Sequence, residues 1–219
     1  MKKAIAVILP LVLLASAVSC SKNSSSSETP SAASSAVSDV QNVGGYTKSV
    51  LQDNVLVNEC ANIRMNIPDD LRLASDKELS DLVASSASYY NDEKNIAFES
   101  GIIWDSWITN NGNLENVFLR FIDTKTAFPN SSDAAAEDVL DVYRERNDGS
   151  GAKYEDRAKV SLGGAEYVRE VFSFEASDFD PAHYNYMYAR KLDDGLVCLI
   201  SISTINGQNT PEYFEKLFN

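Results

Sequence analysis

The chain has 219 residues and a formal net charge of −13, from 32 acidic against 19 basic side chains. Such a surface repels polyanions, and the sequence lacks the basic stripe that nucleic-acid-binding proteins carry. We therefore expect no nucleic-acid partner, and no direct contact of the folded part with anionic lipid.

The N-terminus has the parts of a secretion signal. Two lysines precede an apolar run over residues 4–18, which ends just before Cys20. A retained transmembrane anchor is the weaker alternative, because the run contains Pro10 and is shorter than the ~20 apolar residues that a spanning helix needs.

Residues 17–20, Ala-Val-Ser-Cys, resemble a bacterial lipobox, the site cut by lipoprotein signal peptidase. The resemblance implies that signal peptide 1–19 is removed and that Cys20 carries diacylglycerol and a fatty acid such as palmitate. Two or three acyl chains hold a soluble domain at a membrane. We expect the mature protein at the outer face of the cytoplasmic membrane, or on the periplasmic side if the cell has two membranes. The alternative is a plainly secreted protein in which Cys20 is incidental.

The next segment, residues 20–45, predicts a flexible tether. It is rich in serine, has no aromatic residue and carries almost no aliphatic bulk. Such a composition cannot bury enough apolar surface to offset the entropy of ordering. Residues 46–219 then have the length of a single domain with one core.

The first half of this domain predicts two hairpins and one helix. Short β-rich runs cover residues 54–61 and 62–69, and Ser75 or Asp76 can cap a helix that reaches about Tyr90. Two further β-rich runs, residues 96–109 and 116–123, flank an Asn-Asn-Gly-Asn turn and predict a hairpin.

The second half predicts a helix over 132–146, four strands over 152–162, 165–176, 184–193 and 196–205, and a terminal helix over 210–218. Strands joined by tight connections form an antiparallel meander. The element order is therefore ββ-α-ββ-α-ββββ-α, an α+β fold in which about three helices flank an antiparallel β-sheet.

Several stretches resemble lipoprotein members of the PsbP-like superfamily, which includes many uncharacterised lipoproteins of Gram-positive bacteria. They are IPDD (67–70), SSDAAAEDVLDVYRE (131–145), LGGAEYVRE (162–170), YARKLDDGLVCLISIST (188–204) and TPEYFEKLF (210–218). The resemblance covers residues 46–219 and implies a non-enzymatic accessory or binding fold.

Catalytic and metal-binding patterns are scarce. The one histidine, His183, would have to serve any hydrolase, yet the sequence has no GxSxG or SxxK motif. Neither Cys60 nor Cys198 lies in a metal-binding spacing, and Asp178 with Asp180 is more typical of a turn than of a calcium loop. We expect no catalytic residue, metal or cofactor. A Cys60–Cys198 disulfide remains open.

Aromatic residues supply the one candidate ligand surface. Tyr184, Tyr186 and Tyr188 alternate and so share one face of a strand, whereas Trp104 and Trp107, three residues apart, should lie on opposite faces. The tyrosines could be a core face under a helix, or an exposed aromatic shelf to which Trp107 contributes.

The sequence thus predicts a membrane-anchored extracytoplasmic lipoprotein that acts as a non-catalytic ligand-binding or accessory module. Its partner would be an unknown protein or small ligand. The alternatives are a cell-envelope assembly partner and an extracellular hydrolase that depends on His183.

Overall fold

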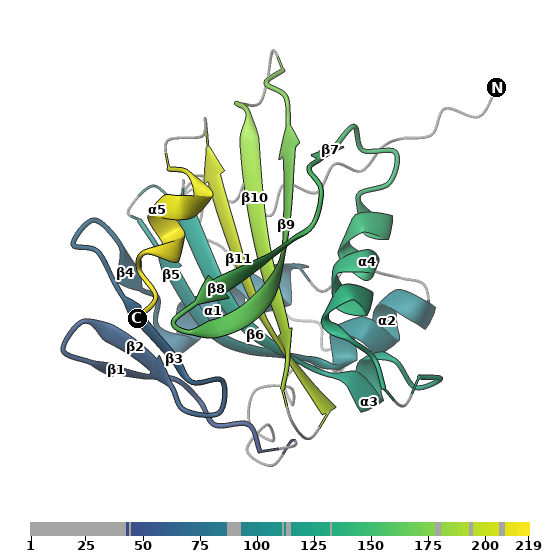
Figure 1. Cartoon of the computed structure of the whole chain (residues 1–219), viewed down its shortest axis with the longest axis horizontal. Helices are drawn as coiled ribbons and strands as arrows, with labels where there is room; N and C mark the ends of the chain where they lie inside the picture. The colour runs from purple at the N-terminus through teal and green to yellow at the C-terminus, as the bar shows by residue number, and fades with distance from the viewer. Residues whose placement is uncertain are drawn as a thin grey trace, which may run out of the picture.

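An eight-stranded antiparallel sheet forms the centre of the computed structural model (Figure 1). The structure describes residue 43 and residues 45–219, apart from 87–92, 111, 113–114, 132, 178–180, 193–194 and 206–208. The strand order is β4-β5-β6-β11-β10-β9-β7, and β8 also pairs with β9. The strands are β4 (Arg72–Leu73), β5 (Ile102–Thr109), β6 (Glu115–Asp123), β7 (Lys153–Tyr154), β8 (Ala158–Leu162), β9 (Ala165–Phe174), β10 (His183–Lys191) and β11 (Leu196–Ile205).

One side of this sheet, called the closed face, lies under a second sheet and a short helix. The second sheet has the order β1-β2-β3 and consists of β1 (Val50–Gln52), β2 (Val55–Asn58) and β3 (Ile63–Asn66). The C-terminal helix α5 (Pro211–Glu215) lies on the same side (Figure 1). Leu56 and Met65 of the small sheet and Phe214 of α5 join the largest apolar core, together with Ile200 and Ile202 of β11.

The opposite side, called the helical face, carries α1 (Asp76–Ser86), α2 (Glu93–Ser100), α3 (Thr124–Ala127) and α4 (Ala136–Arg146). Helix α4 packs on β9 and β10, and α1 packs on β5. Val139 and Leu140 of α4 share a second core with Leu199 of β11. In the described part of the chain no helix is both long and apolar enough to span a membrane.

The predicted α+β class with an antiparallel sheet is confirmed. The predicted strand over 96–109 is wrong in its first part, because residues 93–100 form α2 and β5 begins only at Ile102. Phe98 explains the helix, since its ring is buried edge-on against Phe128 and Tyr143. Gly101 separates the two elements where a Cβ atom would come within 2.7 Å of the Ala127 side chain.

Other boundaries also differ from the prediction. The segment predicted as one strand, 152–162, forms the two strands β7 and β8, and β1 and β4 were not predicted. The first helix begins at Asp76, with Ser75 at its cap; its last described residue is Ser86.

Candidate functional site

The tyrosine stripe packs in the core. Tyr184, Tyr186 and Tyr188 share the closed face as their alternation predicts, but Tyr186 and Tyr188 are only 4% and 0% exposed. The Tyr186 hydroxyl donates to the backbone carbonyl of Asn209 at 3.2 Å, and the Tyr188 hydroxyl donates to Oε1 of Glu215 at 3.2 Å. Burial, and then the Glu215 charge, raises the pKa of Tyr188 well above its ordinary value. The exposed-shelf interpretation is therefore wrong for these two residues.

The two tryptophans lie on the same face, contrary to the prediction. A β-bulge at Asp105 inserts one residue into β5, so that Trp104 pairs with Arg120 while Trp107 pairs with Phe118. Both indole rings contact Phe118, Trp104 edge-on and Trp107 stacked. Without the extra residue, a spacing of three would have put them on opposite faces.

Trp107 therefore does not join the tyrosines in one ligand surface. Strand register aligns Tyr186 with Ile202 and Val117 on the closed face, and the adjacent row aligns Met187 with Ser201, Phe118 and Trp107 on the helical face. The Trp107 Nε1 donates to Oδ1 of Asn116 at 2.8 Å. The predicted surface of Trp107 with the three tyrosines is divided between two sides of the sheet.

The helical face carries a group of polar side chains that we call the polar seam. Its members come from β5, β6, β10 and β11, and they are Thr109, Asn116, Arg120, Asn185, Ser201 and Ser203. All except Asn185 are buried. Ser203 donates to Oδ1 of Asn185 at 2.7 Å, and Thr109 donates to Oδ1 of Asn116 at 2.9 Å. The seam runs between α1, which packs on β5, and α4, which packs on β9 and β10.

Arg120 is the charged member of the seam, and it is 3% exposed. Its Nη1 donates to the Tyr143 hydroxyl at 2.7 Å and its Nη2 donates to Oγ of Ser201 at 2.6 Å. The guanidinium lies 5.0 Å from the Trp104 ring centroid and 5.1 Å from that of Tyr143. Its Nε is buried without a hydrogen-bond partner, and within the described residues no ion pair includes Arg120.

Two neighbouring arginines of α4 have acidic partners. Arg144 Nε donates to Oε1 of the buried Glu170 at 2.7 Å, and Arg146 Nη1 donates to Oε1 of Glu99 at 2.7 Å. The charge of Arg120 is thus met by hydroxyls and aromatic rings, whereas Arg144 and Arg146 each meet a carboxylate.

Arg120 was not predicted as a site residue, although the sequence contains a signal of its burial. It interrupts the otherwise apolar run VFLRFI of residues 117–122. A charged residue in a run that reads as buried on both faces indicates a charge inside the protein, where partners or function must account for it.

The remaining predicted site residues offer no cluster. Cys20, Asp178 and Asp180 lie outside the described residues, and the lipid attachment at Cys20 stays a prediction. His183 begins β10 and is 9% exposed. Within the described residues no three His, Cys, Asp or Glu side chains come together in a way that could hold a metal ion.

The two described cysteines are free thiols. Cys198 is fully buried, and burial raises its pKa to about 12. Cys60 is half-buried and donates to Oδ1 of Asn58 at 3.1 Å.

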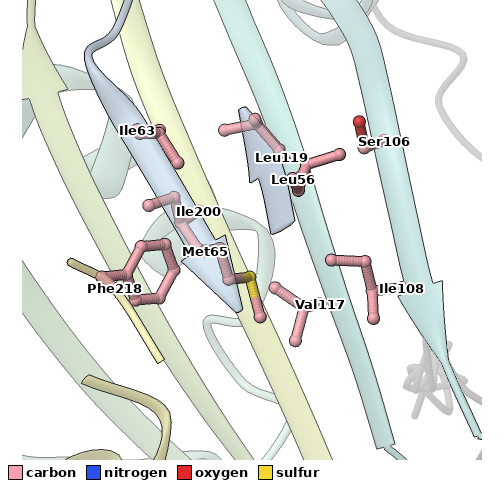
Figure 2. A pocket seen from close by; sticks show the side chains of 9 residues that line it. All are labelled: Leu56, Ile63, Met65, Ser106, Ile108, Val117, Leu119, Ile200 and Phe218. Atoms are coloured by element: carbon pink, nitrogen blue, oxygen red, sulfur yellow. The ribbon is translucent and has the colours of Figure 1, made fainter. Parts of the chain in front are cut away.

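A small cavity lies on the closed face, between the two sheets (Figure 2). Its volume is about 10 Å³, and Ser106 is the one polar side chain among the nine residues that line it. A buried water needs a site of at least this size with two or more polar partners. The cavity is therefore a packing gap with an apolar wall and no ligand site.

Comparisons with known proteins leave the family open. No protein-family model matches the sequence, and a search of curated proteins gives no match. A solved Bacteroides thetaiotaomicron protein aligns at 11% identity and a TM-score of 0.38, over 77% of this chain but only 48% of that protein. LpqN of Mycobacterium tuberculosis, described as involved in cell envelope biogenesis, aligns at 12% identity and a TM-score of 0.39, over 71% and 77% of the two chains. Values this low assign neither family nor function.

Proposed function

We propose that the protein is a lipid-anchored extracytoplasmic module that binds its ligand without transforming it, on the helical face of the large sheet. The anchoring part rests on the lipobox-like residues before Cys20 and on the serine-rich segment that follows. The non-catalytic part agrees with the PsbP-like resemblance of residues 46–219.

The position of Arg120 carries the choice of the helical face. Burying a charge is costly unless it is paired and hydrogen-bonded, so an unpaired buried charge needs an explanation. Among the described residues of the closed face, the aromatic stripe is covered by α5 and the cavity is lined by apolar side chains apart from Ser106.

Cell fractionation tests the anchor. The full-length protein should sediment with membranes, and Cys20→Ala should move it to the soluble fraction. Cys60→Ala is the matched control, because it removes a half-buried thiol that is not at the predicted cleavage site. If Cys20→Ala stays with the membrane, the lipid attachment is wrong.

Hydrogen exchange tests the binding face. Backbone amides of the full-length protein would be compared with and without the small-molecule fraction of envelope extract from the producing cells. We expect slower exchange in β6, β11 and α4. Unchanged exchange over all three elements contradicts a binding module that uses the helical face.

A second candidate, an envelope assembly partner, is favoured by exposed apolar side chains on β1. Val50 and Leu51 are 49% and 50% exposed on a strand at one end of the small sheet's order. Exposed strand edges invite pairing with another chain. Slower exchange in β1 upon addition of envelope proteins, with no change on the helical face, would favour this candidate instead.

A further inference from the structure

We infer that the ligand of the helical face presents a small oxyanion, a carboxylate or a phosphate, to Arg120 between the rings of Trp104 and Tyr143. This inference rests on the proposed binding function and adds the chemical class of the ligand. Guanidinium groups match the paired oxygens of carboxylate and phosphate with two parallel hydrogen bonds.

The other arginines of this region show what Arg120 lacks. Arg146 lies 4.7 Å from the Phe98 ring centroid and also pairs with Glu99. Arg144 lies 4.6 Å from the Tyr154 ring centroid and also pairs with Glu170. In both of these arginines a carboxylate accompanies the ring contact.

Among the described residues, Arg120 contacts aromatic rings and donates hydrogen bonds to hydroxyls only. Cation–π contact contributes less free energy than the effective cost of taking an ion out of water. Tyr143 and Ser201 accept two of its hydrogen bonds, and Nε has no partner. An oxyanion would supply both the opposite charge and the acceptors that are otherwise missing.

Arg190 is the useful comparison on the closed face. Its Nε is also buried without a partner, and its guanidinium lies 4.9 Å from the Tyr167 ring centroid. However, Arg190 is only half-buried and donates to the backbone carbonyl of Ala61. Its charge is therefore partly solvated by water. Arg120 is 3% exposed, so its charge is shielded from solvation by water.

The two flanking rings indicate the route by which a ligand would reach Arg120. Trp104 and Tyr143 are half-buried, so part of each residue beside the guanidinium is accessible to solvent. They come from β5 and α4, elements on opposite sides of the seam. Small rotations of these two side chains would admit an oxyanion, while a bulky ligand would keep the rest of its structure outside.

Tryptophan fluorescence gives a direct readout, because the chain has two tryptophans and both lie on the helical face. The full-length protein in detergent would be titrated at neutral pH with acetate and, separately, with inorganic phosphate. Sodium chloride would keep the ionic strength constant. We expect a saturable emission change with at least one of the two anions and a higher thermal midpoint, since a ligand that binds only the native state stabilises it.

Arg120→Met should abolish both effects, and Arg64→Met, which removes an exposed arginine of β3, should leave them intact. If Arg120→Met does not fold, Arg120→Lys replaces it as the test, because lysine keeps the charge but loses the planar fork. We expect about tenfold weaker binding for Arg120→Lys, the loss of one bidentate contact.

The outcomes separate the two proposals. A response to acetate alone identifies a carboxylate ligand, and a response to phosphate alone identifies a phosphate ligand. No saturable response, or an equal response in wild type and Arg120→Met, overturns the oxyanion inference. In that case slower hydrogen exchange on the helical face with envelope extract would still support the binding module, with a ligand of another class.

Discussion

Asp105 on the closed face and Arg120 on the helical face are both buried charged groups, and the fold surrounds them differently. On the closed face, Asp105 is 1% exposed and accepts hydrogen bonds from the Tyr46 hydroxyl, the Ser49 backbone N–H and the Ser106 hydroxyl. On the helical face, Arg120 is as deeply buried but has fewer partners than donors.

The difference indicates two roles. Groups of the chain itself supply the hydrogen bonds that Asp105 accepts. These bonds hold the N-terminal segment to the domain, so the charge of Asp105 stabilises the fold. Arg120 is only partly satisfied, and polar groups left short of partners are where function is expected. Predictions at three sites test this contrast.

The largest effect is expected where the closed face is sealed by apolar packing. Phe214 of α5 is 0% exposed and contacts the rings of Tyr186 and Tyr213. Phe214→Ala should lower the free energy of unfolding by about 3–5 kcal/mol, from lost burial and the cavity left behind. Denaturant unfolding measures this. Ile96→Ala, at an exposed site of α2, should change stability by less than about 0.5 kcal/mol.

A loss below about 1 kcal/mol for Phe214→Ala would mean that α5 is a loosely held cover. The tyrosines beneath it would then be accessible in solution, and the contrast between the two faces would fail.

The shared face of the three tyrosines was predictable from sequence, whereas the shared face of the two tryptophans was not. Alternation of Tyr184, Tyr186 and Tyr188 needs only the period of a regular strand, which β10 keeps. The Trp104 and Trp107 prediction failed because a bulge adds one residue to β5, and nothing in that stretch marks it.

Long-range packing explains the other failure. Residues 96–100 read as strand in isolation, but Phe98 is placed by contacts with Phe128 and Tyr143, which lie far along the chain. Whether Arg120 has a carboxylate partner likewise depends on which helices the fold brings to it. The run VFLRFI predicts a buried charge, while the lack of an acidic partner for Arg120 among the described residues is visible only in three dimensions.

Asp105→Asn tests the contrast between the two faces at the buried carboxylate. It should have the second largest effect on the free energy of unfolding. The amide can keep an acceptor oxygen for Tyr46 and Ser49, but it replaces the oxygen that accepts from Ser106 with a donor and removes the negative charge. We expect a loss of about 2 kcal/mol, because hydrogen bonds to a charged group contribute more than bonds to a neutral one. Thermal and denaturant unfolding measure it, and Asp81→Asn, on the exposed side of α1, is the matched control.

Hydrogen exchange locates the effect of Asp105→Asn. Amides of residues 46–52 should exchange faster, because the variant loosens the junction between the N-terminal segment and the sheet. Equal exchange there, together with wild-type stability, would show that Asp105 does not fix this junction.

The smallest effect is expected at the start of α1, at the border of the helical face. Ser75 and Glu78 form a capping box: the Glu78 N–H donates to Oγ of Ser75 at 3.3 Å, and the Ser75 N–H donates to Oε2 of Glu78 at 2.8 Å. Ser75→Ala should cost about 1 kcal/mol. Arg72 binds the same carboxylate, at 2.7 Å from Oε1.

Acid unfolding separates the Glu78 carboxylate from the rest of the cap. The Arg72 hydrogen bonds, and then the Ser75 N–H, hold the pKa of Glu78 at about 2, below its ordinary value of 4.5. A lowered pKa in the folded state means that the stabilisation is present above pH 4.5 and is lost as the pH falls toward 2. Glu78→Gln should therefore match wild type near pH 2 and be less stable at neutral pH. If the two unfolding curves differ by the same amount at both pH values, the capping contact does not depend on the charge of Glu78, and α1 is held to β5 by Leu79 and its apolar neighbours instead.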